Sequence, residues 1–217
     1  MSWPSAEIFG IAALSLRVAL VATLIACALG IPVGAWLGST AFRGRRTLLT
    51  ALNTALALPT VVVGLVLYLL LARRGPLGGL QLLYTWRAIV LAETVLAFPI
   101  AASLSAAAVQ ALDPRVLRTA LTLGAGPLRA AWAVLREARL ALAAAVAVAF
   151  GRVLSEVGAA LIVGGNIRGE TRTLTTAITL ATSQGDFGIA VALGLILLAL
   201  ALTVNAVLQM LHGRGDA

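Results

Sequence analysis

The sequence predicts an all-α, polytopic protein that crosses a lipid bilayer about five times. The chain has 217 residues, of which 61% are hydrophobic and 11% charged, and its mean hydropathy is +1.04. A soluble core does not need this much apolar surface, whereas a helical membrane bundle does. Most of the chain falls into apolar runs of about 20 residues, the length that crosses about 30 Å of hydrocarbon. We therefore expect a single membrane domain over residues 1–217.

The five expected spans are separated by polar segments. They cover residues 18–38, 48–71, 88–111, 140–163 and 187–211. Residues 8–16 either extend the first span or lie at the membrane interface before Arg17. Pro32 predicts a kink in the first span, and Pro59 predicts a break or kink near the middle of the second, because proline lacks the N–H group that a helix interior uses. Pro99 lies inside the third span.

The longest polar interruption, residues 112–139, has the pattern of two short helices joined by a hinge. Asp113 is a good N-cap and Pro114 suits the first helical position, so a helix is expected over residues 115–123. Gly124 and Gly126-Pro127 end that helix, and a second one is expected over 128–138. From the residues alone, this segment is either a docking surface for a soluble partner or a well-ordered loop. A second polar segment, 164–186, is expected to hold a short surface helix at 171–182.

Five spans place the two termini on opposite sides of the membrane. The side that holds residues 112–139 carries nine arginines and the other side carries six. An excess of basic residues marks the cytoplasmic side. We therefore expect the 112–139 segment and the polar tail at 212–217 in the cytoplasm, and the N-terminus outside. The chain shows no internal repeat, which argues against an inverted-repeat carrier.

Residue types that the chain lacks exclude several function classes. All sixteen basic residues are arginines, so the chain cannot form a Walker A phosphate loop, which needs a lysine. Any ATP and Mg²⁺ must then bind to another chain, and we expect no cofactor or metal on this one. Cys27 is the only cysteine and His212 the only histidine, so no disulfide, zinc site or histidine-dependent catalytic triad is available. The arginines lie between apolar spans, where attraction to the inner leaflet explains them better than nucleic acid does.

Ionisable residues inside the expected spans are candidates for function. Arg152 and Glu156 are four residues apart, so they share one face of the fourth span and can form an ion pair. Because a charge at the bilayer centre costs about 2.5 to 3.5 kcal/mol, we expect them to face the bundle rather than lipid. The pair either locks the span to a neighbour or contributes to a translocation pathway. Glu93 lies near the start of the third span, where a solvated helix end is the ordinary interpretation.

The 112–139 segment resembles the cytoplasmic "EAA" loop of ABC importer permeases. Arg118-Thr119-Ala120 stands where that family has Glu-Ala-Ala, and Gly124 matches its glycine. The downstream Ile-x-Leu-Pro of the family falls on residues 134–137, where only the hydrophobic position is kept. Three further stretches, 58–65, 151–159 and 163–167, resemble the molybdate and tungstate permeases of that family. Within that group, the amino-acid sequences at 135–139 and 155–158 are closer to those of tungstate permeases.

The resemblance implies a type I importer permease fold and a division of labour between chains. Two permease copies form the pathway, an ATPase subunit holds each cytoplasmic loop, and an external binding protein delivers the substrate, a tetrahedral oxyanion. The implied ATPase-coupling residues are Asp113, Arg115, Arg118, Thr119, Ala120 and Gly124. Candidates for the translocation pathway are Arg152, Glu156, Pro59 and Thr60. Candidates for the external mouth are Gly164, Gly165, Asn166, Arg168 and Thr173, for which an ordinary loop is the alternative.

The resulting hypothesis is a non-catalytic permease subunit in a prokaryotic inner membrane that imports tungstate, driven by ATP hydrolysis on a partner chain. Molybdate or sulfate are alternative substrates. A different class of protein, a proton-coupled carrier or channel, would use Arg152, Glu156 and Glu93 as a relay. A purely structural membrane protein is the remaining alternative. Copurification with a soluble ATPase separates the importer from the carrier, which works alone.

Overall fold

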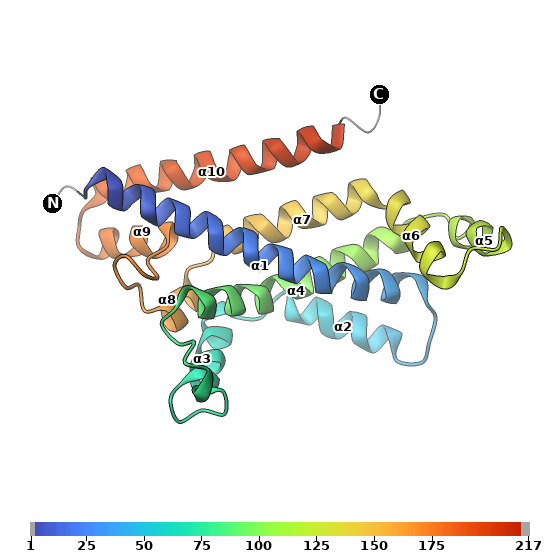
Figure 1. Cartoon of the computed structure of the whole chain (residues 1–217), viewed down its shortest axis with the longest axis horizontal. Helices are drawn as coiled ribbons and strands as arrows, with labels where there is room; N and C mark the ends of the chain where they lie inside the picture. Colours follow the sequence, from blue (N-terminus) through green and yellow to red (C-terminus); the bar gives the residue numbers. More distant parts are fainter. Residues whose placement is uncertain (1–2, 214–217) are drawn as a thin grey trace.

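The computed structural model describes residues 3–213, and the part of the chain it describes contains helices and no strand. Residues 214–217, the end of the expected polar tail, lie outside the described residues. Figure 1 shows the helices, most of them running along one long axis. They are α1 (Ser5–Ser39), α2 (Arg45–Ala55), α3 (Thr60–Leu71), the 3-10 helix η1 (Gly78–Leu80), α4 (Trp86–Gln110), α5 (Arg115–Thr122), α6 (Pro127–Glu137), α7 (Arg139–Leu154), α8 (Gly158–Gly164), α9 (Leu174–Ser183) and α10 (Phe187–Gly213).

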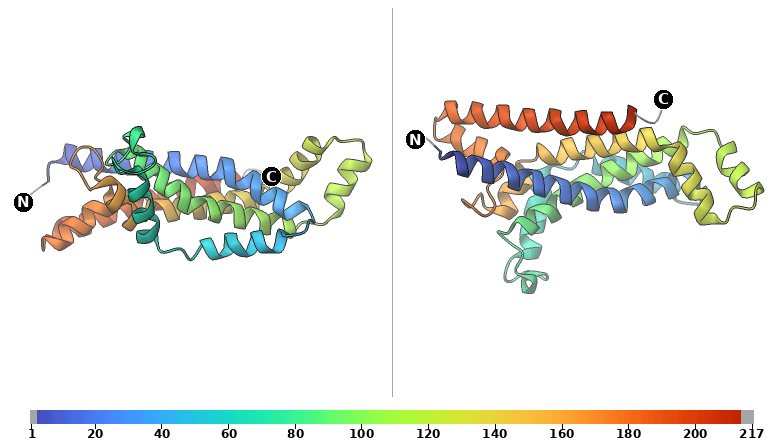
Figure 2. Two further views of the ribbon diagram at one scale, coloured as in Figure 1. Left: turned by 90° about the horizontal axis from the view of Figure 1, so that it is seen from below. Right: turned by 45° about the horizontal axis from the view of Figure 1, so that its top comes forward.

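Within the described residues, three helices and two bent helix pairs are apolar enough to cross a membrane. The helices are α1, α4 and α10, and the pairs are α2 with α3, bent by 97°, and α7 with α8, bent by 57°. Counting each pair as one span gives up to five spans, in agreement with the expected number. The break at Pro59 is confirmed, and its size is clear in Figure 2, where α3 leaves the direction of α2. The break between α7 and α8 was not predicted.

The first span is longer than expected and remains unbroken. α1 starts at Ser5, so residues 8–16 belong to the same helix as the rest of the span. The helix continues through Pro32, and α4 likewise continues through Pro99. Proline is tolerated inside membrane helices because neighbouring helices and local adjustments satisfy the freed backbone groups.

Close packing of α1 against α4 forms the centre of the fold. Both helices run in the same direction, since Gly30, Gly34 and Gly38 of α1 meet successively later residues of α4. The partners along this contact are Ala101, Ala102, Ser105, Ala106 and Val109. Glycine and alanine let two helix backbones approach closely, and this packing is a main source of helix association in a membrane. α7 packs on both of these helices, whereas α8 packs on α4 and α3.

α9 is a buried helix rather than the surface helix expected at 171–182. Leu174 and Ala177 are fully buried and pack against Ile11 of α1 and Leu193 of α10. Thr175 and Thr176 are buried as well, because their hydroxyl groups bond to neighbouring residues instead of to water. α10 lies along the outside of the bundle (Figure 2), and its large exposed side chains, among them Phe187, Leu195 and Leu202, are apolar, as a helix in contact with lipid requires.

Candidate functional site

The break between α7 and α8 is organised around the carboxylate of Glu156. Glu156 is only 4% exposed. Its Oε2 accepts a hydrogen bond from Nη1 of Arg152 at 2.7 Å, so the expected ion pair forms. Its Oε1 accepts a hydrogen bond from the backbone N–H of Ala159 at 3.0 Å. Glu156 therefore caps the first turn of α8, which means that it lies in the break and not on a continuous helical face shared with Arg152.

Thr175 holds the same break from a third element. Its hydroxyl donates to the backbone oxygen of Glu156 at 2.7 Å and so connects α9 to the residues between α7 and α8. The backbone groups left free where a helix is interrupted need such partners inside a membrane. Sequence reasoning missed Thr175, because it belongs to the segment that was expected on the surface.

The two broken spans meet at their breaks. A Cβ atom built on Gly158, the first residue of α8, would lie 2.9 Å from Oγ1 of Thr60 and 3.5 Å from Oε1 of Glu156. One turn further, a Cβ on Gly64 would lie 2.9 Å from the Cα of Ala159. The backbone oxygen of Pro59 accepts hydrogen bonds from the first turn of α3. The structure thus brings together Thr60 and Glu156, two residues that the sequence pointed to separately.

Glu93 is buried and not at a solvated helix end. It is 4% exposed, and its Oε2 has no hydrogen-bond partner among the described residues. α8 packs against α4 near this residue. One turn earlier, a Cβ on Gly164 would lie 2.8 Å from Ile89, so the two helices are in tight contact there. The expectation failed because position along a span does not reveal which neighbouring helix covers it.

The expected external mouth contains an ion-paired cluster with the N-terminal end of α1. Nε of Arg168 donates to Oε1 of Glu7 at 2.8 Å, and its Nη2 donates to Oε2 of the same carboxylate. Arg172 reaches Glu7 at 3.4 Å and Oδ1 of Asn166 at 3.3 Å. The hydrogen bond to Glu7 and the attraction of its negative charge raise the pKa of Arg168. Asn166 and Gly165 both have positive φ, 51° and 73°, and form the turn after α8.

Thr173 does not lie at the mouth surface. It is buried and forms a capping box with Thr176 at the start of α9. The backbone N–H of Thr173 donates to the Thr176 hydroxyl at 2.9 Å, and the backbone N–H of Thr176 donates to the Thr173 hydroxyl at 3.4 Å. Its role in the fold is therefore to begin a buried helix. Gly164 is also buried, against Ile89, which places it inside the bundle.

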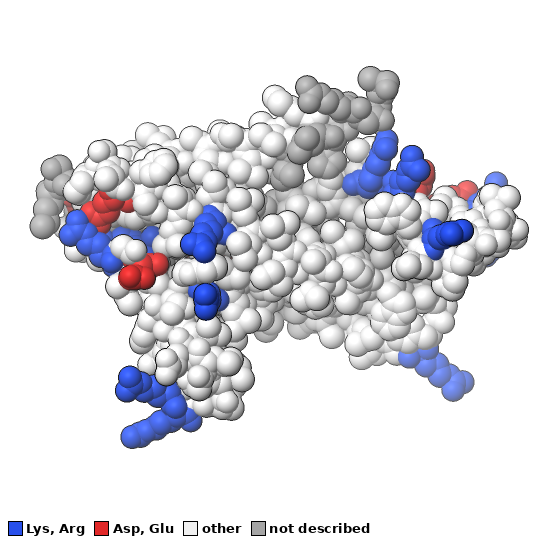
Figure 3. All heavy atoms as spheres, in the orientation of Figure 1, with Lys and Arg blue, Asp and Glu red and all other residues white. Residues whose placement is uncertain are grey.

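The 112–139 segment forms the two helices that the sequence predicts. α5 and α6 extend beyond the end of the bundle in Figure 1, and Figure 3 shows basic side chains gathered over them. Oδ1 of Asp113 accepts a hydrogen bond from the N–H of Arg115 at 2.8 Å, as an N-cap does. Arg118 and Thr119 are exposed and Ala120 is half-buried. The segment also exposes four large apolar side chains, Leu121 (49%), Leu123 (82%), Leu128 (85%) and Trp132 (68%).

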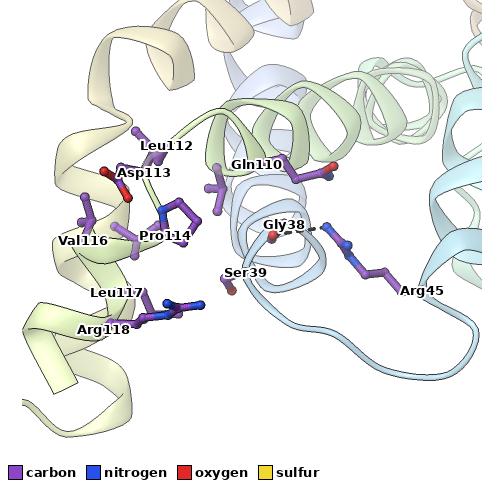
Figure 4. A pocket seen from close by; sticks show the side chains of 12 residues that line it. Gly38, Ser39, Arg45, Gln110, Leu112, Asp113, Pro114, Val116, Leu117 and Arg118 are labelled. Carbon is purple, nitrogen blue, oxygen red and sulfur yellow. Dashed lines mark hydrogen bonds between the residues drawn. The ribbon is translucent and has the colours of Figure 1, made fainter. Parts of the chain in front are cut away.

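A cavity of about 460 Å³ separates the start of α5 from the ends of α1 and α4. Figure 4 shows the cavity, with the side chain of Arg118 directed toward Ser39. Opposite them, Nε of Arg45 donates to the backbone oxygen of Leu37 at 2.6 Å and Nη2 donates to that of Gly38 at 3.3 Å. These bonds satisfy the last carbonyl groups of α1. α5 is thus placed directly beside the ends of the two most tightly packed helices.

Gly124 is the one residue of the α5–α6 hinge whose backbone conformation would be strained if it carried a side chain. Its φ is +82°, and no atom would contact an added Cβ. Gly124→Ala is therefore expected to destabilise the hinge by about 1 kcal/mol through backbone strain alone. Gly126→Ala is the matched control, because Gly126 has an ordinary φ of −64° and equally open surroundings. Hydrogen exchange of the α5 and α6 amides should rise about fivefold in Gly124→Ala only, and an equal rise in both variants would contradict the prediction.

Comparison with known proteins places this arrangement in a family. Residues 30–214 match the family described as binding-protein-dependent transport system inner membrane component. The chain is 42% identical to the tungstate uptake system permease protein TupB of Peptoclostridium acidaminophilum, over 95% of this chain and 90% of that protein. It is 34% identical to the molybdenum transport system permease protein ModB of Escherichia coli K12, over 87% of this chain and 86% of that protein.

A solved structure shares the fold. It is a crystal structure of an amino acid ABC transporter with histidines. The match covers 99% of this chain and 100% of the chain in that structure, with a TM-score of 0.69 and 17% sequence identity. At that identity, this likeness shows the fold alone. The length of the family match and the identity to full-length permeases lead to one conclusion: the chain belongs to the binding-protein-dependent transport system inner membrane components, a family of multi-pass membrane permeases.

Proposed function

We propose that this chain is the permease subunit of an ATP-driven importer for a tetrahedral oxyanion, and that the oxyanion is tungstate. The observation that carries the proposal is the exposed α5–α6 segment, which combines basic and large apolar side chains beyond the end of the bundle. A soluble partner that buries such a segment explains why it is not covered by the chain itself. The choice of tungstate rests on the higher identity to a tungstate permease than to a molybdenum permease, 42% against 34%.

The proposed complex has two copies of this chain, cytoplasmic ATPase subunits and an external binding protein. ATP and Mg²⁺ bind to the ATPase, and α5 seats on it through Arg115, Arg118, Thr119, Ala120 and Gly124. The complex lies in the inner membrane, with α5 and α6 in the cytoplasm and the N-terminus outside. The loop after α8, with Gly165, Asn166 and Arg168, faces the binding protein. No nucleic acid takes part.

In the proposed mechanism, movement of α5 is transmitted to the span breaks. α5 borders the ends of α1 and α4 across the 460 Å³ cavity, which leaves it room to move. The breaks at Pro59 and at Glu156 are the places where the spans can change direction without loss of helical bonds elsewhere. Arg152 supplies positive potential beside the anion, and Glu156 balances it so that the anion is not held too tightly.

The test is transport by the purified chain reconstituted with its ATPase and binding protein. Tungstate is expected to stimulate ATP hydrolysis and to accumulate inside the vesicles, at least tenfold more efficiently than molybdate or sulfate. Preference for molybdate would leave the permease function in place and reject tungstate. Uptake driven by a proton gradient in vesicles without ATPase would instead favour the carrier, for which the buried Glu93 is the supporting observation.

A further inference from the structure

Arg17 lies in the middle of an apolar stripe on the outward face of α1. Phe9 and Leu24 on this face are 76% and 68% exposed, and Leu20 is exposed as well. Spacings of three, four and eight residues keep these side chains on the face that carries Arg17, which is itself exposed. α1 is one of the helices apolar enough to cross the membrane. A guanidinium group on such a face needs an anionic partner, because it is costly to leave it unpaired next to lipid.

Two guanidinium groups from different helices meet at one tryptophan. The Cζ atom of Arg17 lies 4.0 Å from the centroid of the Trp86 ring, and the Cζ atom of Arg87 lies 5.8 Å from it. Trp86 and Arg87 are the first residues of α4, so the positive end of that helix adds to the local potential. Figure 3 shows basic side chains over α1 and the start of α4, surrounded by uncharged surface and separate from the charged ends of the molecule.

Neither of these arginines has a carboxylate partner in the part of the chain that the structure describes. Arg152, Arg168 and Arg172 each form an ion pair with a glutamate. Among the described residues, the contacts made by the Arg17 and Arg87 guanidinium groups are those with the Trp86 ring. Two cations and an indole at the edge of a lipid-facing helix therefore form a site with free hydrogen-bond donors and no negative charge of its own.

We propose that Arg17 and Arg87 bind the phosphate of an anionic phospholipid in the leaflet opposite α5 and α6. The planar guanidinium group matches phosphate oxygens with two parallel hydrogen bonds. Trp86 belongs at the boundary between headgroups and hydrocarbon, where its ring is apolar and its N–H polar. The acyl chains then lie along Leu20 and Leu24. Because no carboxylate is present to receive an amine, phosphatidylglycerol fits the site better than phosphatidylethanolamine does.

The test uses Trp86 as a reporter in the full-length chain. Trp3→Phe, Trp36→Phe and Trp132→Phe together leave Trp86 as the only tryptophan, and this protein is placed in nanodiscs with acyl chains brominated near the headgroup. At equal mole fraction, brominated phosphatidylglycerol is expected to quench Trp86 fluorescence at least threefold more than brominated phosphatidylethanolamine. Arg17→Gln with Arg87→Gln should abolish this preference. Arg43→Gln with Arg46→Gln, at the other end of the molecule, should keep it.

Three results would overturn the proposal. Equal quenching by both lipids means that the site has no headgroup preference, and no quenching by either means that Trp86 faces protein. Loss of the phosphatidylglycerol preference on addition of tungstate or inorganic phosphate assigns the site to a free oxyanion. A second readout avoids the tryptophan substitutions: added phosphatidylglycerol should raise the melting temperature of the unmodified chain in detergent by several degrees, and should not raise that of the double arginine variant.

Discussion

Gly34→Ala is expected to separate α1 from α4 and to destabilise the bundle by about 3 kcal/mol, at the upper end of the cost of overpacking. A Cβ at this position would lie 2.2 Å from the backbone oxygen of Ala102 and 2.8 Å from the Cβ of Ser105. Backbone atoms cannot rotate away as a side chain can, so the helices must move apart along their whole contact. Loss of this packing removes a main source of association for membrane helices.

The measurement is the melting temperature of the detergent-solubilised chain, followed by the fraction that remains monodisperse after heating. Gly10→Ala is the matched control in the same helix, because nothing lies within 4 Å of an added Cβ there. It should be neutral or slightly stabilising, since alanine favours a helix more than glycine does. Equal melting temperatures for the Gly34→Ala and Gly10→Ala variants would contradict the close contact between α1 and α4 at Gly34.

The second large effect is expected at the ion pair in the α7–α8 break. Arg152→Gln leaves the carboxylate of Glu156 buried without its cation, and Glu156→Gln removes the negative charge that caps α8. Breaking a buried ion pair costs about 3 to 5 kcal/mol. The Arg152 side chain is 38% exposed, so we expect a smaller loss of about 2 kcal/mol for Arg152→Gln. Under the proposed function, tungstate uptake should also fall at least tenfold.

The double variant separates a structural role from a transport role. Arg152→Gln with Glu156→Gln can hold a neutral hydrogen bond in place of the ion pair, so most of the lost stability should return. Uptake should stay low, because the positive potential beside the anion is still missing. Melting temperature and uptake by the reconstituted complex are measured on the same preparations. Recovery of both quantities would assign the pair to the fold alone and remove Arg152 from the pathway.

Local signals made the spans and the α5–α6 segment predictable. Proline and glycine positions at Pro59, Pro114 and Gly124 correctly indicated a break, a helix start and a helix end, since each limits the backbone by its own chemistry. The α7–α8 break carries no proline. It is held by the ion pair of Arg152 with Glu156, which the sequence predicts on an unbroken helix, and by Thr175 from α9, a contact that is not visible in a single sequence.

The misplaced site residues share a physical cause. Thr173 belongs to a polar stretch, and polarity predicts exposure, yet Thr173 and Thr176 satisfy one another inside the bundle. The distance of Glu93 from the span end predicts a solvated side chain, although Glu93 is buried in the bundle. Glu7 was missed because its partner Arg168 lies 161 residues away. In each case the burial of the side chain, or its partner, depends on a segment that is distant in sequence. Hydropathy along the chain does not show such contacts.

The glycine contacts between α1 and α4 also limit the order in which the protein can assemble during synthesis. The residues that meet are about seventy positions apart, so α1 enters the bilayer long before its partner has left the ribosome. Until then the closely packing face of α1 has only lipid or the insertion machinery against it. A nascent chain that stalls before residue 110 should therefore remain an open target for quality-control proteases, however stable the finished bundle is.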